Sequence, residues 1–184
     1  HKVHHIVLSP SIEIAEQVNE RLARHANLSS DGRPTLTISS SHLAEIVFEA
    51  SQKNVLIPAH VWTPWFSVFG SKSGFDSIQE CYEDQAQRIF ALETGLSSDP
   101  AMNWRISALD KYALVSNSDS HSAQKIGREA NVFELALVSY NSIIDAIRSK
   151  DPQKFICTYE FYPEEGKYHY DGHRNCGVSL SPSQ

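Results

Sequence analysis

Three segments that we predict as β-strands end in side chains that can bind metal ions or transfer protons. His60 follows one apolar run, Glu93 ends a second, and Asp119 and His121 follow a third. Imidazole and carboxylate groups together suit Zn²⁺, Mn²⁺ or Fe²⁺, and the sequence lacks the C-x-x-C pattern of a thiolate site. Such ions bind phosphate oxygens and lower the pKa of a bound water toward about 7. These side chains therefore predict a divalent metal site that could activate a water and bind a phosphate group.

The expected geometry of each candidate indicates which of these side chains can face one metal site together. A single histidine at a strand end is more often structural than a ligand, so the prediction depends on the three strand ends together. Asp119 and His121 lie two residues apart, and in an extended segment both face the same side. His4 and His5 face opposite sides of the opening strand, so we expect only one of them to face the site. Glu93 either assists the ligands and proton transfer or caps the turn that follows it.

Other candidates lie in the loop after His60 and after the Asp119-x-His121 motif. The loop is rich in aromatic residues, and Trp62, Trp65 and Phe75 could form the walls that surround a base flipped out of a duplex. The alternative is that these rings fix the loop to the core. Lys125 and Arg128 could bind DNA phosphates, although any one surface cation is more often only solvated.

The elements that must position these residues follow an α/β pattern, because short apolar runs alternate with stretches of helical periodicity. In barrel-like α/β folds the carboxyl ends of parallel strands meet at one mouth, which would bring the candidate residues together. The expected strands are residues 3–8, 54–60, 88–93, 112–116 and 154–161. One expected helix carries Ile14, Val18 and Leu22, a second covers 41–52, a third begins at Ser77, and two more cover 101–109 and 139–149.

The composition is that of an ordinary globular domain, with 41% hydrophobic and 21% charged residues in a chain of 184. The formal charge of −6 argues against DNA binding by a bulk positive field, although bound cations would add positive charge where a phosphate lies. No apolar run approaches the roughly 18–20 residues that span a bilayer. Three scattered cysteines do not form a disulfide framework, which favours a cytoplasmic location.

The strand-end histidine and the later Asp-x-His resemble the PHP (polymerase and histidinol phosphatase) superfamily. Longer segments are similar to its endonuclease Q group and together extend over most of the chain up to Cys176. These segments are Pro58 to Phe66, Ser73 to Asp76, Glu93 to Pro100, Ser116 to Ser122, Gly127 to Asn131 and Glu160 to His169.

The resemblance implies a distorted (β/α)7-type PHP barrel that holds two or three divalent ions, which would be zinc, manganese or magnesium. It implies His5, His60, Asp119 and His121 as metal ligands, with His4 as the alternative to His5. Asp119, His121 and Glu93 would serve the chemistry, which is nicking of DNA 5′ to uracil, hypoxanthine, xanthine or an abasic site during repair. A PHP-type small-molecule phosphoesterase and a non-catalytic DNA-binding module stay open as alternatives.

The resemblance also predicts that the chain is a piece of a longer protein. It begins at His1 without methionine, and the family's H-x-H motif and bridging glutamate are expected before that point. Residues 1–162 are then the C-terminal portion of the barrel, without its N-terminal strands and helices. Residues 163–184 are a linker toward a zinc module, with Cys176 as one zinc ligand. Contacts with replication or repair factors would come from other regions, and the activity of the chain by itself stays open.

Overall fold

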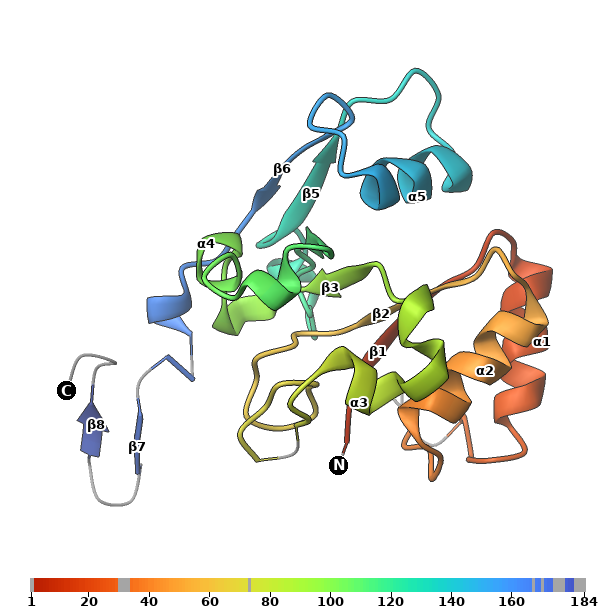
Figure 1. Ribbon diagram of the computed structural model, residues 1–184, viewed down its shortest axis with the longest axis horizontal. Helices are drawn as coiled ribbons and strands as arrows, with labels where there is room; N and C mark the ends of the chain where they lie inside the picture. Colours follow the sequence, from red (N-terminus) through yellow and green to blue (C-terminus); the bar gives the residue numbers. More distant parts are fainter. Residues whose placement is uncertain are drawn as a thin grey trace.

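The strands form pairs, as the computed structural model of the chain shows (Figure 1). The structure describes residues 2–29, 34–72, 74–166, 168–169, 171–173 and 178–180. Among these residues the fold is mixed α/β, with one parallel and three antiparallel strand pairs. The pairs are β1 (His5–Leu8) with β2 (Val55–Pro58), β3 (Ala91–Glu93) with β4 (Ala113–Val115), β5 (Ala130–Phe133) with β6 (Phe155–Tyr159), and β7 (Asp171–His173) with β8 (Val178–Leu180).

The direction of β1 differs from the parallel arrangement that the sequence predicts. β1 runs antiparallel to β2, with His5 opposite Pro58 and Leu8 opposite Val55. The start of β1 therefore lies beside the carboxyl end of β2. As a result the histidines that open β1 and the histidine that follows β2 reach the same region from opposite strand ends.

Strand β2 is buried on both faces, which explains its continuous apolar sequence. Leu56 packs into a core with α1 (Ile12–Leu22), α2 (Ser40–Ala50) and α3 (Ile78–Tyr82). Val55 and Ile57 point the other way, into a core shared with β3, β4 and α5 (Tyr140–Ser149). The alternation of side chains along a strand thus distributes one apolar run between two cores.

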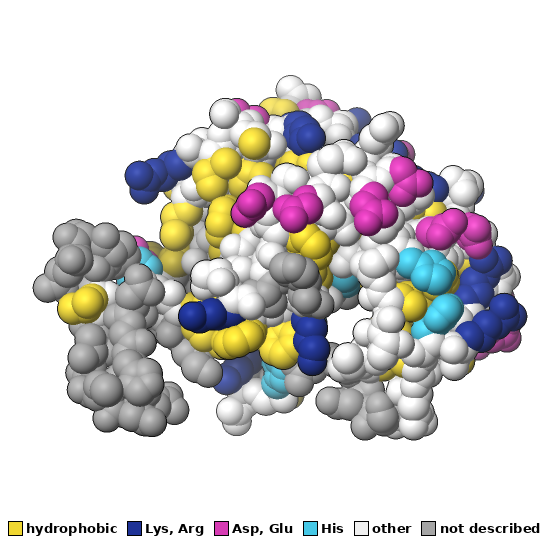
Figure 2. Space-filling model, turned by 60° about the horizontal axis from the view of Figure 1, so that its bottom comes forward, with side chains coloured by type: hydrophobic (Ala, Val, Ile, Leu, Met, Phe, Trp, Pro, Cys, Tyr) yellow, Lys and Arg dark blue, Asp and Glu magenta, His cyan; other side chains and the backbone are white. Residues whose placement is uncertain are grey.

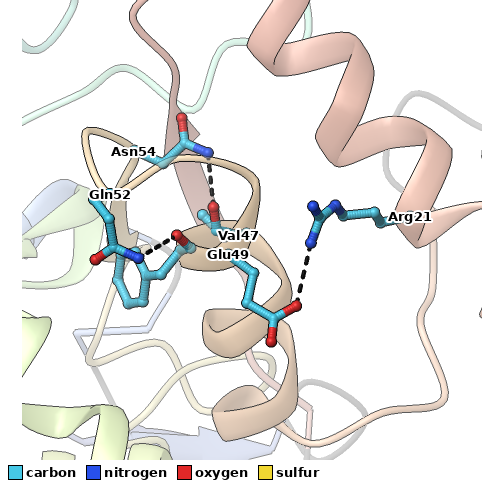
Figure 3. A network of polar contacts seen from close by, with 6 residues as sticks. Arg21, Val47, Glu49, Gln52 and Asn54 are labelled. Atoms are coloured by element: carbon cyan, nitrogen blue, oxygen red, sulfur yellow. Dashed lines mark hydrogen bonds and ion pairs between the residues drawn. The ribbon is translucent and has the colours of Figure 1, made fainter.

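Polar contacts fix the start of β2 to the helices (Figure 3). The buried Asn54 donates from Nδ2 to the carbonyl of Val47 at 2.7 Å, at the end of β2 opposite His60. In the core that β2 shares with β3, β4 and α5, the hydroxyl of Tyr140 donates to the carbonyls of Leu8 and Lys53, at 3.0 and 2.6 Å. These contacts hold the end of β1 and the start of β2 in place relative to α2 and α5.

Several elements differ from the sequence-based expectation. The helix expected over 101–109 is broken into α4 (Pro100–Asn103) and η3 (Ser107–Leu109). The Asn103 side chain donates to the carbonyl of Asp99 at 2.8 Å, so a side chain competes with the backbone ladder there. The strand expected over 88–93 is only β3, because Arg88 ends the 3₁₀ helix η1 (Glu83–Arg88). The remaining 3₁₀ turns are η2 (Gly95–Ser97), η4 (Ala123–Lys125) and η5 (Pro163–Glu165).

Two further strand features were not expected from the sequence. β5 was not predicted, and it pairs with the predicted strand β6. The segment expected to be a linker contains β7 and β8 as an antiparallel pair. Within the described part of the chain, no helix has the length and apolar character needed to cross a membrane.

Candidate metal site at the strand ends

The rings of His4 and His60 are in contact, although they are 56 positions apart in the sequence. Nδ1 of His4 lies 2.9 Å from Nε2 of His60, and the ring planes are inclined at 69°. His4 also stacks on Phe66, with ring centroids 5.0 Å apart. Because a metal–nitrogen bond is about 2.1 Å long, two nitrogens at this separation can both reach one ion.

The surroundings of His60 favour the tautomer that a metal ligand needs. Thr63 donates from Oγ1 to the carbonyl of Trp65 at 2.8 Å, so the same hydroxyl accepts from Nδ1 of His60 at 2.9 Å. A proton on Nδ1 leaves the Nε2 lone pair of His60 directed toward His4. His60 itself has a φ of 32°, which is uncommon for a residue other than glycine.

His5 carries a buried nitrogen that has no hydrogen-bond partner among the described residues. This atom is Nε2, and the ring meets Tyr82 edge-on with centroids 5.7 Å apart. Burial lowers the pKa of His5 to about 4, and the charge of His4 adds to the effect. The imidazole is therefore neutral at pH 7 and has a lone pair available for a cation.

The prediction that only one of His4 and His5 faces the site is wrong, because both line the same cavity. β1 begins at His5, so His4 lies before the strand and strict alternation does not apply to the pair. The structure brings His4 into direct contact with His60 and places His5 deeper, against Tyr82. Which of the two binds a metal stays a prediction.

Glu93 is buried at the end of β3, and both of its carboxylate oxygens accept hydrogen bonds. Oε2 accepts from the backbone N–H of His60 at 2.7 Å, and Oε1 accepts from Nδ2 of Asn117 at 2.8 Å. Burial raises the pKa of Glu93 to about 7, the two hydrogen bonds oppose this shift, and the charge of Asp119 adds to it. The carboxylate thus connects the ends of β2 and β4. It does not cap the turn that follows it, because η2 has no side-chain cap.

Asp119 and His121 do not share the extended backbone that the sequence predicts. Asp119 has a φ of 43°, so the chain turns at this residue. Asp119 and His121 are both exposed, but only Asp119 lines the cavity, and Nδ1 of His121 lies 2.8 Å from the carbonyl oxygen of Asp119. Arg128 stabilises the turn, since Nε donates to the carbonyl of Ser118 at 2.8 Å and Nη2 to that of Asp119 at 3.4 Å.

A cavity of about 750 Å³ connects these groups. Its polar lining includes His4, His5, His60, Glu93, Asn117 and Asp119, and its apolar lining includes Leu36, Ile38, Leu43 and Phe75. In the described ranges, no three His, Cys, Asp or Glu side chains lie close enough together to hold an ion. The donor types, the His4–His60 contact and the unpaired Nε2 of His5 nevertheless fit a divalent cation in this cavity.

The aromatic candidates of the loop have different surroundings. Trp62 packs on Phe69 and donates from Nε1 to Asn103 at 2.8 Å, which fixes the loop to the core. Trp65 is 52% exposed, and Phe75 lines the cavity. Phe66, another aromatic residue of this loop, is 42% exposed, lines the cavity and stacks on His4.

Among the remaining candidates, Lys125 is exposed in η4, whereas Arg128 uses its guanidinium on backbone carbonyls. Cys176 lies outside the described residues. The sequence also gave no indication of the roles of Thr63, Asn117 and Asn131, because their contacts join distant segments. Asn117 is a polar residue just after the end of β4, and Asn131 is a polar residue inside β5. These positions are the signal that could have drawn attention to the two asparagines.

Comparison with known proteins agrees with the predicted resemblance. Residues 105–152 match the family model described as PHP-associated. The chain is 31% identical over 180 residues to the uncharacterized protein YqxK of Bacillus subtilis (strain 168), which covers 95% of this chain and 44% of the relative.

Two solved structures are similar to almost the whole chain. One is the lesion-specific endonuclease PfuEndoQ from Pyrococcus furiosus, with a TM-score of 0.84 and 30% identity over 98% of this chain and 44% of that protein. The other is endonuclease Q in complex with a 27-mer duplex substrate that has an abasic lesion at the active site, with a TM-score of 0.86 and 30% identity over 99% of this chain and 45% of that protein. The predicted resemblance to PHP proteins and endonuclease Q is thereby confirmed, and the chain spans less than half the length of these relatives.

Proposed function

We propose that the protein containing this chain is a metal-dependent endonuclease of the PHP type that nicks DNA 5′ to a deaminated base or an abasic site. The observation that carries the proposal is the contact of His4 with His60 in a cavity that His5 and Asp119 also line. Imidazoles and a carboxylate from separate segments thus face one space that can accept a divalent cation and a phosphate. The likeness to endonuclease Q supports DNA, rather than a small molecule, as the substrate.

In this proposal His60, Asp119 and either His5 or His4 hold metal ions, and His121 joins them when the substrate or further ligands are in place. When bound, the ions polarise the phosphate and supply a nucleophilic water at neutral pH. The apolar side chains at the cavity wall, including Phe75, contact the extruded base. Exposed Trp65 and Phe66 are placed to contact the neighbouring nucleotides.

The proposal concerns the full-length protein, because the chain spans less than half of its relatives. We propose that the remaining ligands, for two or three zinc, manganese or magnesium ions, come from residues outside the chain. Those residues would also complete a distorted (β/α)7-type barrel with residues 1–162. Residues 163–184 would lead toward a zinc module in which Cys176 is a ligand.

A nicking assay tests this function. The full-length protein is incubated with duplexes that carry one uracil, hypoxanthine, xanthine or abasic site, with Mn²⁺ or Mg²⁺. We expect a single nick 5′ to the lesion and none in undamaged duplex. Asp119→Asn removes a metal-binding carboxylate at nearly constant volume, so the nicking rate should fall about 100-fold or more. Asp110→Asn, which changes an exposed carboxylate, is the matched control and should nick like the wild type.

Two other outcomes would replace the proposal. Hydrolysis of free phosphate monoesters without cleavage of any duplex would identify a small-molecule phosphoesterase. Binding of lesion-containing DNA without hydrolysis of either substrate, with every divalent metal tried, would identify a non-catalytic DNA-binding module.

A further inference from the structure

A continuous hydrogen-bonded network joins the ends of three strands at the cavity to β5. Its side chains are Glu93, Asn117 and Asn131, which we call the amide–carboxylate network. Oε1 of Glu93 accepts from Asn117 at 2.8 Å, and Oδ1 of Asn117 accepts from Nδ2 of Asn131 at 3.1 Å. Glu93 is the last residue of β3, Asn117 lies just beyond β4, and Asn131 lies in β5.

At one end of the network, Glu93 holds the backbone of His60. Oε2 of Glu93 accepts from the His60 N–H at 2.7 Å, and the N–H of Val61 donates to the Glu93 carbonyl at 3.0 Å. His60 needs such support because its φ of 32° is unfavourable for a residue with a Cβ atom. A carboxylate acceptor gives a stronger hydrogen bond than a neutral one, so it can maintain this conformation.

At the other end, Asn131 fixes the chain just before Asp119. Oδ1 of Asn131 accepts from the Ser116 N–H at 2.9 Å, and Nδ2 donates to the Ser116 carbonyl at 2.8 Å. The side-chain amide thus pairs with both backbone groups of one residue, as a neighbouring strand would. This fixes the end of β4, from which the turn that carries Asp119 begins.

We propose that the amide–carboxylate network is a positioning device that holds His60 and the Asp119 turn in register across the cavity. The proposal rests on the proposed function, since it assigns the network to the metal-binding side chains of that site. Glu93 acts here as a positioning residue, because both of its oxygens are occupied by His60 and Asn117 and only 3% of its surface is exposed. Asn131 influences the site through Ser116 and Asn117 without lining the cavity.

The test compares variants of the network with a buried asparagine outside it. Asn131→Ala removes the paired contacts with Ser116, and Glu93→Gln leaves one acceptor oxygen for two donors. Asn117→Asp is the second-choice variant if either fails to fold, since it replaces one donor by an oxygen that faces Glu93. Asn54→Ala is the matched control, because Asn54 is 3% exposed and bonds Val47 at the far end of β2 (Figure 3).

Two quantities are measured in the full-length protein: the Kd for Mn²⁺ by calorimetry, and the deuterium exchange rate of the His60 amide. We expect Asn131→Ala and Glu93→Gln to weaken Mn²⁺ binding about 10–100-fold and to accelerate exchange at His60. Asn54→Ala should lower the melting temperature to a similar extent and leave both quantities close to wild type.

The proposal is overturned if Asn131→Ala lowers the melting temperature as Asn54→Ala does but leaves Mn²⁺ affinity and His60 exchange unchanged. The network would then serve stability alone. Failure of the proposed function has a different signature, which is a wild-type protein that binds no Mn²⁺. In that case the exchange rate of the His60 amide in Asn131→Ala still decides whether the network positions His60.

Discussion

Two glutamates are buried in the fold, Glu93, which lines the cavity, and Glu129, and burial disfavours the ionised form of each. Burial raises the pKa of Glu129 to about 7, and the charges of Glu160 and Glu93 add to the shift. Glu129 is only 2% exposed, and its Oε2 is buried without a hydrogen-bond partner in the described part of the structure. Groups that are kept in such costly surroundings are a common feature of functional sites.

Replacement of Glu129 by glutamine should therefore stabilise the chain in a pH-dependent way. The folded-state pKa of about 7 lies above the ordinary value of 4.5, so the folded state binds the proton more tightly than the unfolded state. The stabilisation that comes from binding this proton is complete below pH 4.5 and is lost as the pH rises from 4.5 through about 7. Above that pH the stabilisation is absent. Glu129→Gln should raise the free energy of unfolding by about 1–3 kcal/mol at pH 8 and by little at pH 4.

Urea denaturation of the two proteins at both pH values measures this difference. Glutamine can still accept at Oε1 from the N–H of Phe161, as the carboxyl group does at 3.4 Å. An equal effect at the two pH values would show that packing, and not ionisation, distinguishes the side chains.

At the scale of elements, the sequence predicted what depends on neighbours along the chain. The apolar run of β2, the helix with Ile14, Val18 and Leu22, and the helix that begins at Ser77 were all expected, and the structure confirms them. Capping and periodicity act within a few residues, so the sequence displays them directly.

What the sequence did not predict depends on contacts between distant segments. The antiparallel direction of β1 is set by its pairing with β2, and β5 likewise forms through its pairing with the distant strand β6. For the site, residue types identified the strand-end groups, but the contact of His4 with His60 and the role of Asn131 require the fold. Backbone turns at His60 and Asp119 likewise result from tertiary contacts that override local preference.

The packing of the η2 turn against the end of β2 leads to a prediction about Gly95. Its φ is +63°, and an added Cβ would lie 2.5 Å from Cβ of His60, so something must move. Gly95→Ala should displace His60, lower the free energy of unfolding by roughly 2–4 kcal/mol and weaken Mn²⁺ binding. Gly127 is the matched control, since its φ is +81° but a Cβ there meets nothing within 4 Å.

Gly127→Ala should cost only the backbone strain, about 1 kcal/mol, and leave Mn²⁺ binding intact. Thermal unfolding and metal titration of both variants measure the two effects. Equal losses of stability in the two variants would mean that the turn at Gly95 adapts and that its contact with His60 does not constrain the site.

At the scale of the whole molecule, the charge of the chain limits how DNA could be held in the proposed function. The formal charge is −6, and Figure 2 shows acidic, basic and hydrophobic side chains interspersed on the face that it presents. A chain of this kind gains little from the general attraction of phosphates to a positive surface. In the proposed function, divalent cations at the cavity would supply positive charge where the scissile phosphate would lie.

Affinity for an abasic duplex should therefore depend on the metal more than on ionic strength. Binding is measured by fluorescence anisotropy with Mn²⁺ between about 50 and 200 mM salt. The slope of log Kd against log salt concentration should correspond to about three neutralised phosphates or fewer. Removal of the metal by EDTA should weaken binding roughly tenfold or more. Asp119→Asn separates the two sources of attraction, because it removes a negative charge and a metal-binding group together. General attraction predicts tighter binding by this variant and metal-mediated attraction predicts weaker binding, while Asp110→Asn reports the charge effect alone. Tighter binding by Asp119→Asn, with affinity unaffected by EDTA, would show that phosphates are held by the protein surface and not through the cavity.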